Sequence, residues 1–151
     1  MCTAIYYASS NQEFRTEFPD PRACLPVIKK QGGIALLPWG RRKQQTGKLP
    51  LGGWARLDAI YGGHWDRWRP LPVKLDIRQF MEVDFEGNRR WFDVTSGKWI
   101  QGLIAHCHHE RRVYVVTITP ELDDSEYERW PRILSAGNRS KSPVAADFGT
   151  Y

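Results

Sequence analysis

Two consecutive stretches, KWIQGLIAHCHH (98–109) and RRVYVVTIT (111–119), decide the fold class of this chain. Both are rich in β-branched, aromatic and other apolar residues, which is the composition of β-strands. Outward from them, turn signals at Gly62-Gly63, Glu86-Gly87-Asn88 and Ser96-Gly97 separate further strand-like stretches. These further predicted strands are CTAIYYA (2–8), PVIKKQGGIALLPWG (26–40, a hairpin turning at Gln31-Gly32-Gly33), WARLDAI (54–60), PVKLDIRQFMEVDF (72–85) and RRWFDVT (89–95).

Two short helices are predicted beside these strands. SNQEFRTEF (10–18) is predicted to be helical because Ser10 and Glu13 have the spacing of a capping box. TPELDDSEYERW (119–130) is predicted to begin a helix, with Thr119 as N-cap, Pro120 at the first helical position and acids in the first turn. We expect one α+β domain over residues 1–151, dominated by antiparallel strands that curl into a barrel-like shape, with an irregular tail from Ser135.

Composition restricts the function without deciding it. The chain has 22 Lys and Arg residues against 17 Asp and Glu, a formal net charge of +5, which fits either an anionic partner or an ordinary basic surface. Neither a leader peptide nor a membrane-spanning run is evident, and the three cysteines have no metal-type spacing, so we expect a reduced, cytoplasmic protein. Four of the seven tryptophans lie in basic or glycine-rich stretches, where they suit either core packing or base stacking: Trp39, Trp54, Trp65 and Trp68.

Two familiar sites are not supported by their spacing. GRRKQQTGK (40–48) differs from a phosphate-binding loop, because six residues separate Gly40 from Gly47 and Leu49 follows Lys48. In AHCHHE (105–110), side chains on a strand alternate, so His106 and His108 face one way while Cys107 and His109 face the other. Each face then offers at most two metal ligands, and we expect neither a metal nor a cofactor.

Read in order, several segments resemble the SRAP family, the SOS response-associated peptidase-like proteins that capture abasic sites in single-stranded DNA. The similarity extends from Met1 to about Leu134, and the order and spacing of the segments carry it. It implies a barrel-like SRAP fold and a role in the DNA damage response, near the nucleoid. The segments are MC (1–2), PVIKKQGGIALLPWG (26–40), WARLDA (54–59), FMEVDFEGNRRWF (80–92), KWIQGLIAHC (98–107), VYVVTITPE (113–121) and ERWPRIL (128–134).

The resemblance also implies which residues act. The family's second-position cysteine falls on Cys2, its glutamate on Glu82 and its active-site arginine, near DNA phosphate, on Arg56. Two positions depart from the family: Trp54 stands where it has asparagine, and Tyr127 where it has histidine. Other departures are Val83 for the family's tryptophan, and Thr3 and Ala4 for the glycine and arginine that follow its cysteine.

The chemistry implied for Cys2 has a physical reason. An abasic sugar in its open form presents an aldehyde, and only an N-terminal cysteine offers it an amine and a thiol on adjacent carbons. An α-amino group of pKa about 7.7–8.0 is roughly 10–17% neutral at pH 7, against about 0.04% for a lysine. The mechanism requires removal of Met1, and Glu82 would serve as general acid and base.

DNA binding is expected to combine charge with aromatic stacking. The residues expected to contact the strand are Arg56, Trp39, Trp54, Arg41, Arg42, Arg67 and Arg69. The expected partner is single-stranded DNA with an abasic site. The protein is expected to bind it as a monomer, and no association with a membrane is expected. Three alternatives remain: a degenerate relative that binds DNA without crosslinking, an autoprocessing cysteine peptidase with His64 in place of the missing histidine, and an interaction protein with no nucleic-acid role.

Overall fold

A computed structural model describes residues 2–9, 11–120 and 126–136 of the chain, and it is mostly β-sheet. Two short helical segments, α1 (Leu57–Tyr61) and the 3₁₀ turn η1 (Asp66–Trp68), interrupt the strands. The strands are β1 (Ala4–Ser9), β2 (Gln12–Glu17), β3 (Cys24–Ile28), β4 (Ile34–Pro38), β5 (Trp54–Arg56), β6 (Leu71–Leu75), β7 (Gln79–Val83), β8 (Arg89–Asp93), β9 (Lys98–Cys107), β10 (Glu110–Ile118), β11 (Trp130–Pro131) and β12 (Ile133–Ser135).

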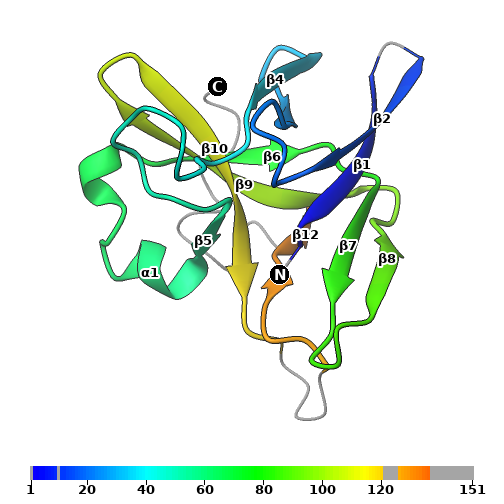
Figure 1. Ribbon diagram of the computed structural model, residues 1–151. Coiled ribbons are helices and arrows are strands. Elements are labelled where there is room, and N and C mark those ends of the chain that lie inside the picture. The colour runs from blue at the N-terminus through cyan, green and yellow to red at the C-terminus, as the bar shows by residue number, and fades with distance from the viewer. Residues whose placement is uncertain (1, 10, 121–125, 137–151) are drawn as a thin grey trace.

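The strands form a small and a large sheet. The small sheet has the order β2-β1-β7-β8, and the large sheet has the order β11-β10-β9-β6-β3-β4, with β12 paired to β9 and β5 paired to β10. All of these pairs are antiparallel except β5 with β10, which is parallel. Figure 1 shows the small sheet on the right and α1 on the left, with β9 and β10 between them.

The central pair β9–β10 is buried on both faces, which explains the apolar runs in its sequence. Successive side chains of a strand point to opposite faces, so Ile104 and Val113 join the main core together with residues of the small sheet. Leu103 and Tyr114 face the other way and join a second apolar cluster under α1 and η1. The pair therefore separates two apolar layers, and Cys2 belongs to the main core.

One glycine in β9 allows the main core to close. Gly102 pairs with Val73 of β6, and a Cβ atom built on Gly102 would lie 2.9 Å from side-chain carbons of Leu75. Real Cβ contacts are essentially never this short. A larger residue at position 102 would therefore force the Leu75 side chain of β6 to shift.

Several sequence predictions are confirmed by the strands. β1 overlaps the predicted first strand and extends one residue beyond it, to Ser9. β3 and β4 form the predicted hairpin, closed by a hydrogen bond from Lys29 N to Gly33 O at 3.0 Å. The predicted turn at residues 86–88 joins β7 to β8. The chain is thus mainly antiparallel β with few helices. The expected barrel is not found, because in the described ranges the two sheets do not close on each other.

The helix predicted over residues 10–18 is wrong. Residues 12–17 form β2, which pairs with β1 so that Phe14 lies opposite Tyr7, with their rings stacked at 5.1 Å. The half-buried residues Phe14 and Thr16 alternate with exposed charged ones, and this period of two outweighs the capping-box spacing. Asn11 turns the chain between the strands with a positive φ of 63°.

Three other predictions need correction or fall partly outside the described residues. The strand predicted over 54–60 ends at Arg56, where α1 begins. Most of the first turn of the helix predicted from Thr119 lies in 121–125, outside the described residues, and residues 126–129 are not helical. The tail predicted to be irregular is described only as far as residue 136, with β12 ending at Ser135. No helix in the described ranges is long and apolar enough to span a membrane.

Candidate functional site

Cys2 lies in the interior, just before β1. Its side chain is fully buried, and its Sγ donates to the carbonyl oxygen of Ala4 at 3.6 Å. The next residue, Thr3, donates its backbone N–H to Met81 O at 3.3 Å, and Ala4 pairs with Met81. The start of the chain is therefore held alongside β7, the strand that carries Glu82.

Glu82 is also fully buried, and its environment changes its acidity. Loss of contact with water raises the pKa of the Glu82 carboxyl to about 7. Burial raises the pKa of the Cys2 thiol, and the negative charge of Glu82 raises it further. The structure thus brings the two residues that the resemblance singled out into electrostatic contact, although they are 80 positions apart (82 − 2). We refer to Cys2, Glu82 and Trp54 together as the amino-terminal site.

Trp54 holds the backbone of Cys2. Its indole Nε1 donates to the carbonyl oxygen of Cys2 at 2.6 Å. The ring is half-buried and packs against Phe18, with a centroid distance of 4.8 Å, and against Trp39, at 6.3 Å. Trp54 stands where the resemblance places an asparagine, and it too supplies a side-chain N–H donor. Its bond to Cys2 is one that sequence reasoning did not predict.

Trp39 is a core residue, which corrects its assignment to the DNA-binding set. Its side chain is fully buried, and its Nε1 donates to the carbonyl oxygen of Gly53 at 3.0 Å. A Cβ atom on Gly53 would lie 2.7 Å from this nitrogen, so the glycine permits the close approach. With its polar edge bonded and its faces covered, the ring is not accessible to a base.

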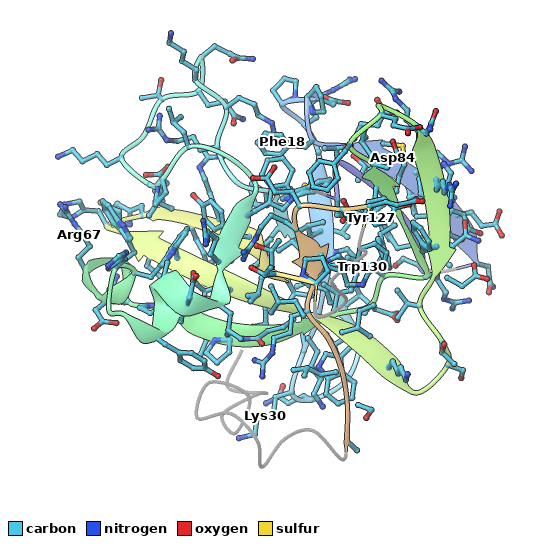
Figure 2. The ribbon with its side chains drawn as sticks, turned by 90° about the horizontal axis from the view of Figure 1, so that it is seen from below. Phe18, Lys30, Arg67, Asp84, Tyr127 and Trp130 are labelled. Atoms are coloured by element: carbon cyan, nitrogen blue, oxygen red, sulfur yellow. The ribbon has the colours of Figure 1, made fainter. Side chains whose placement is uncertain are left out.

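Tyr127 belongs to a second group of aromatic side chains, with Phe92 and Trp130, which pack against the main core. Its ring lies 5.1 Å from that of Trp130 and 5.7 Å from that of Phe92. Trp130 in turn meets the edge of Phe80, at 5.1 Å, and Phe80 shares the main core with Cys2. Figure 2 shows Tyr127 and Trp130 side by side near the middle of the molecule. Tyr127 therefore packs as an aromatic side chain at the position where the resemblance places a histidine.

Arg56 lies on the surface at the end of β5. Its Nη2 forms an ion pair with Asp58 at 3.0 Å, and its hydrogen bonds lower the pKa of that carboxyl. Beside it, the buried Arg129 donates to the hydroxyl oxygens of Thr117 and Thr119. The described contacts of Arg56 are with this surface cluster rather than with Cys2.

Arg41 and Arg42 support the loop 40–53 from within. Arg41 donates to the carbonyl oxygens of Leu49 and Gln45, at 2.6 and 2.9 Å. Arg42 is buried, donates to Phe18 O and Trp39 O, both at 2.6 Å, and lies 4.1 Å above the Phe18 ring. Burial lowers the pKa of Arg42. The assignment of Arg42 to DNA binding is therefore corrected: Arg42 is buried, and its side chain ties the loop to the backbone carbonyls of Phe18, after β2, and Trp39, after β4.

Arg67 and Arg69, in contrast, are exposed and lie together. They come from η1 and the residue that ends it, and they line a surface pocket of about 850 Å³. Sequence reasoning assigned the two arginines to DNA binding but did not include the other residues that line the pocket. We call it the basic pocket; its lining residues are Lys48, Arg67, Trp68, Arg69, His106, Cys107 and His108.

His106 and Cys107 have structural contacts here. The Nδ1 atom of His106 lies 3.0 Å from the carbonyl oxygen of Arg69, which ties β9 to the end of η1. Cys107 packs against the second apolar cluster. In the part of the chain that the structure describes, no three His, Cys, Asp or Glu side chains are grouped closely enough to hold a metal ion.

Comparison with known proteins found no match for this chain. No family model, curated protein or solved structure matches this chain. The resemblance to the SRAP family therefore stays a prediction from the order of its segments.

Proposed function

We propose that this chain is a SRAP-like protein that captures abasic sites in single-stranded DNA through Cys2. The observation that carries the proposal is the burial of Cys2 and Glu82 on neighbouring segments, where Ala4 pairs with Met81 and the charge of Glu82 acts on the Cys2 thiol, with the pKa of Glu82 raised to about 7. A carboxyl with this pKa is close to half protonated at neutral pH, so it can both donate and accept a proton there.

The proposed reaction conserves atoms and electrons without an added oxidant. Once Met1 is removed, the neutral amine of Cys2 attacks the aldehyde carbon of the open sugar and forms a carbinolamine. Glu82 donates a proton to the departing hydroxyl, which leaves as water, and a protonated imine and the Glu82 carboxylate remain. The Sγ atom then bonds to the imine carbon, the thiol proton passes to the Glu82 carboxylate, and the C=N electron pair returns to the nitrogen, which keeps its own proton, to give a thiazolidine.

The surroundings of Cys2 favour the closing step over other cysteine chemistry. The raised pKa of the thiol keeps it protonated until a base beside it accepts the proton, and Glu82 is that base. The bond from Trp54 to the Cys2 carbonyl fixes the backbone next to the amine. A peptidase would instead need a thiolate, and His64 lies in the exposed turn after α1.

The burial of the site suits a substrate without a base. Cys2 and Glu82 are fully buried, and the main core that contains Cys2 is covered in part by the half-buried rings of Trp54 and Trp130, which pack against it. A strand must displace part of this cover, and a sugar that lacks its base requires the smallest opening. This proposal makes the aromatic cover a selective feature, because an intact nucleotide would be too large to enter.

The test uses the protein with Met1 removed, verified by intact mass, and an oligonucleotide with one abasic site. Wild type should give an adduct that survives denaturing electrophoresis without borohydride, and Cys2→Ala should give none. Cys24→Ala is the matched control, because Cys24 lacks an adjacent amine, and this variant should crosslink like wild type. A Cys2→Ala protein that still forms the stable adduct would overturn the mechanism.

A second candidate is a relative that binds the strand without reacting. The full burial of Cys2 and the aromatic residues at positions 54 and 127 favour it. Under this alternative, wild type with Met1 removed binds single-stranded DNA but yields no adduct, and borohydride traps no imine.

A further inference from the structure

The basic pocket is built from three separate segments. Lys48 comes from the loop before β5, and Arg67, Trp68 and Arg69 come from η1 and the residue after it. The remaining lining residues come from the end of β9 and the turn that follows it. Figure 2 shows Arg67 at the left edge of the molecule, away from Tyr127 and Trp130 in the middle. The pocket is therefore a surface feature distinct from the amino-terminal site.

Its charge is positive and is not neutralised locally. Lys48, Arg67 and Arg69 are exposed, and the lining contains no aspartate or glutamate. Among the described residues, no ion pair involves any of these three cations. The nearby Glu110 carboxylate is already used, since it pairs with Arg112 at 2.9 Å and accepts the backbone N–H of Lys48. Three formal positive charges thus face solvent around one hollow.

The pocket is also held in shape. The guanidinium carbon of Arg67 lies 4.4 Å from the centroid of the Trp68 ring, and Trp68 packs on the second apolar cluster. Arg69 and His108 adopt left-handed backbone conformations, with φ of 49° and 55°, and the described chain has only one other non-glycine residue with positive φ. Such conformations carry a cost and are concentrated at binding and catalytic sites.

We propose that the basic pocket binds backbone phosphates of the same single strand, at nucleotides away from the one that reacts at Cys2. This rests on the proposed function in that the ligand is single-stranded DNA. Lys48, Arg67 and Arg69 supply the charge, and the Arg67 guanidinium, stacked on Trp68, offers its outer face to a base. The pocket lies on the second-cluster side of β9–β10, whereas Cys2 lies in the main core, so the strand runs around this pair to reach both.

The experiment measures binding of an intact oligothymidine without an abasic site, so it does not depend on Cys2 chemistry. The triple variant Lys48→Ala/Arg67→Ala/Arg69→Ala is compared with Lys29→Ala/Lys30→Ala/Arg78→Ala, which removes three exposed charges elsewhere. Binding should depend on salt with a slope shallower by about 2 in the pocket variant, since each phosphate contact on single strands contributes about 0.7. The control variant should keep the wild-type slope.

Each outcome has a separate meaning. Equal slopes for the pocket and control variants would overturn the pocket proposal, whatever the crosslinking assay shows. A pocket variant with a shallower slope supports it even if wild type forms no adduct, in which case only the proposed function fails. As a second arm, thymidine monophosphate competing as strongly as the oligonucleotide would show a site for free nucleotides and would overturn the assignment to a strand.

Discussion

The amino-terminal site and the basic pocket place charge in opposite environments. In the first, Glu82 and the Cys2 thiol are fully buried, burial raises the pKa of both groups, and the charge of Glu82 raises the pKa of the thiol further. In the second, three cations stand in water around a hollow, with no acid among the lining residues. The comparison separates two tasks: an interior sets acidity for proton transfer, while a charged surface sets affinity for a polyanion.

The aromatic residues divide along the same line. Trp54 belongs to the amino-terminal site, and its indole N–H donates to Cys2 O. Trp39 packs against Trp54, and its indole N–H donates to Gly53 O. Trp68 instead supports the side chain of a cation at the rim of the basic pocket. Tryptophans beside arginines in the sequence therefore have different roles, and of these three only Trp68 lines the basic pocket.

Replacing Trp39 should have the largest effect on the free energy of unfolding. A small effect would contradict the contrast between the buried amino-terminal site and the exposed basic pocket. Trp39→Ala removes a fully buried ring from the main core and should lower the free energy of unfolding by about 4 kcal/mol. Chemical denaturation measures this loss. The oligothymidine affinity of the folded fraction should stay near wild type, because the ring is not accessible.

Trp68→Ala is the matched variant for this prediction. Its half-buried ring should contribute less to stability than Trp39, while its loss should free the Arg67 side chain and weaken binding. If Trp39→Ala left stability unchanged and weakened DNA binding instead, Trp39 would return to the DNA-binding set.

Glu82→Gln tests the buried carboxyl, and it should have the next largest effect on the free energy of unfolding. The pKa of Glu82 is raised from 4.5 to about 7 on folding, so the folded state binds its proton more tightly than the unfolded state. This stabilisation is complete below pH 4.5 and is lost as pH rises to about 7. The stability of wild type relative to Glu82→Gln should therefore fall by roughly 3 kcal/mol over this range.

Denaturation at several pH values measures this difference, and Glu86→Gln, exposed in the turn after β7, controls for the loss of a charge alone. Adduct formation by Glu82→Gln should also slow by roughly a hundredfold at unchanged oligonucleotide affinity. A pH-independent stability difference, together with an unchanged crosslinking rate, would show that Glu82 neither stores a proton nor transfers one.

The strands were predictable because their signals are local. The apolar runs around Ile104 and Val115 lie on a pair that is buried on both faces, and such strands read as continuous apolar stretches. The stretch at 10–18 was misread because Ser10 and Glu13 matched a helix signal while Phe14 and Thr16 already alternated with exposed residues. A local spacing rule was given more weight than periodicity, which depends on more residues.

The sites were predictable only in part, because their contacts come from distant segments. Chemistry and resemblance indicated Cys2 and Glu82, but neither showed that Trp54 would bond the Cys2 carbonyl. Arg42 was assigned to a surface because it carries a charge, yet folding buries it and brings it to the backbone carbonyls of Phe18 and Trp39. Similarly, Lys48 joins the basic pocket only because tertiary structure brings it beside η1.

The smallest expected change in the free energy of unfolding is that of Arg69→Gly, and its sign is the informative part. Arg69 has φ 49° and ψ 63°, a left-handed conformation that costs an L-residue about 1–2 kcal/mol and glycine little. Arg69→Gly should therefore raise the free energy of unfolding by about 0.5 kcal/mol, after the extra chain entropy of glycine is deducted. Arg67→Gly removes the same charge from within η1, where glycine lowers stability by about 0.5–1 kcal/mol. Both variants should weaken oligothymidine binding, so stability and affinity change in opposite directions only for Arg69→Gly. An Arg69→Gly protein that is less stable than wild type and binds oligothymidine equally well would contradict a functional reason for the strained backbone at Arg69.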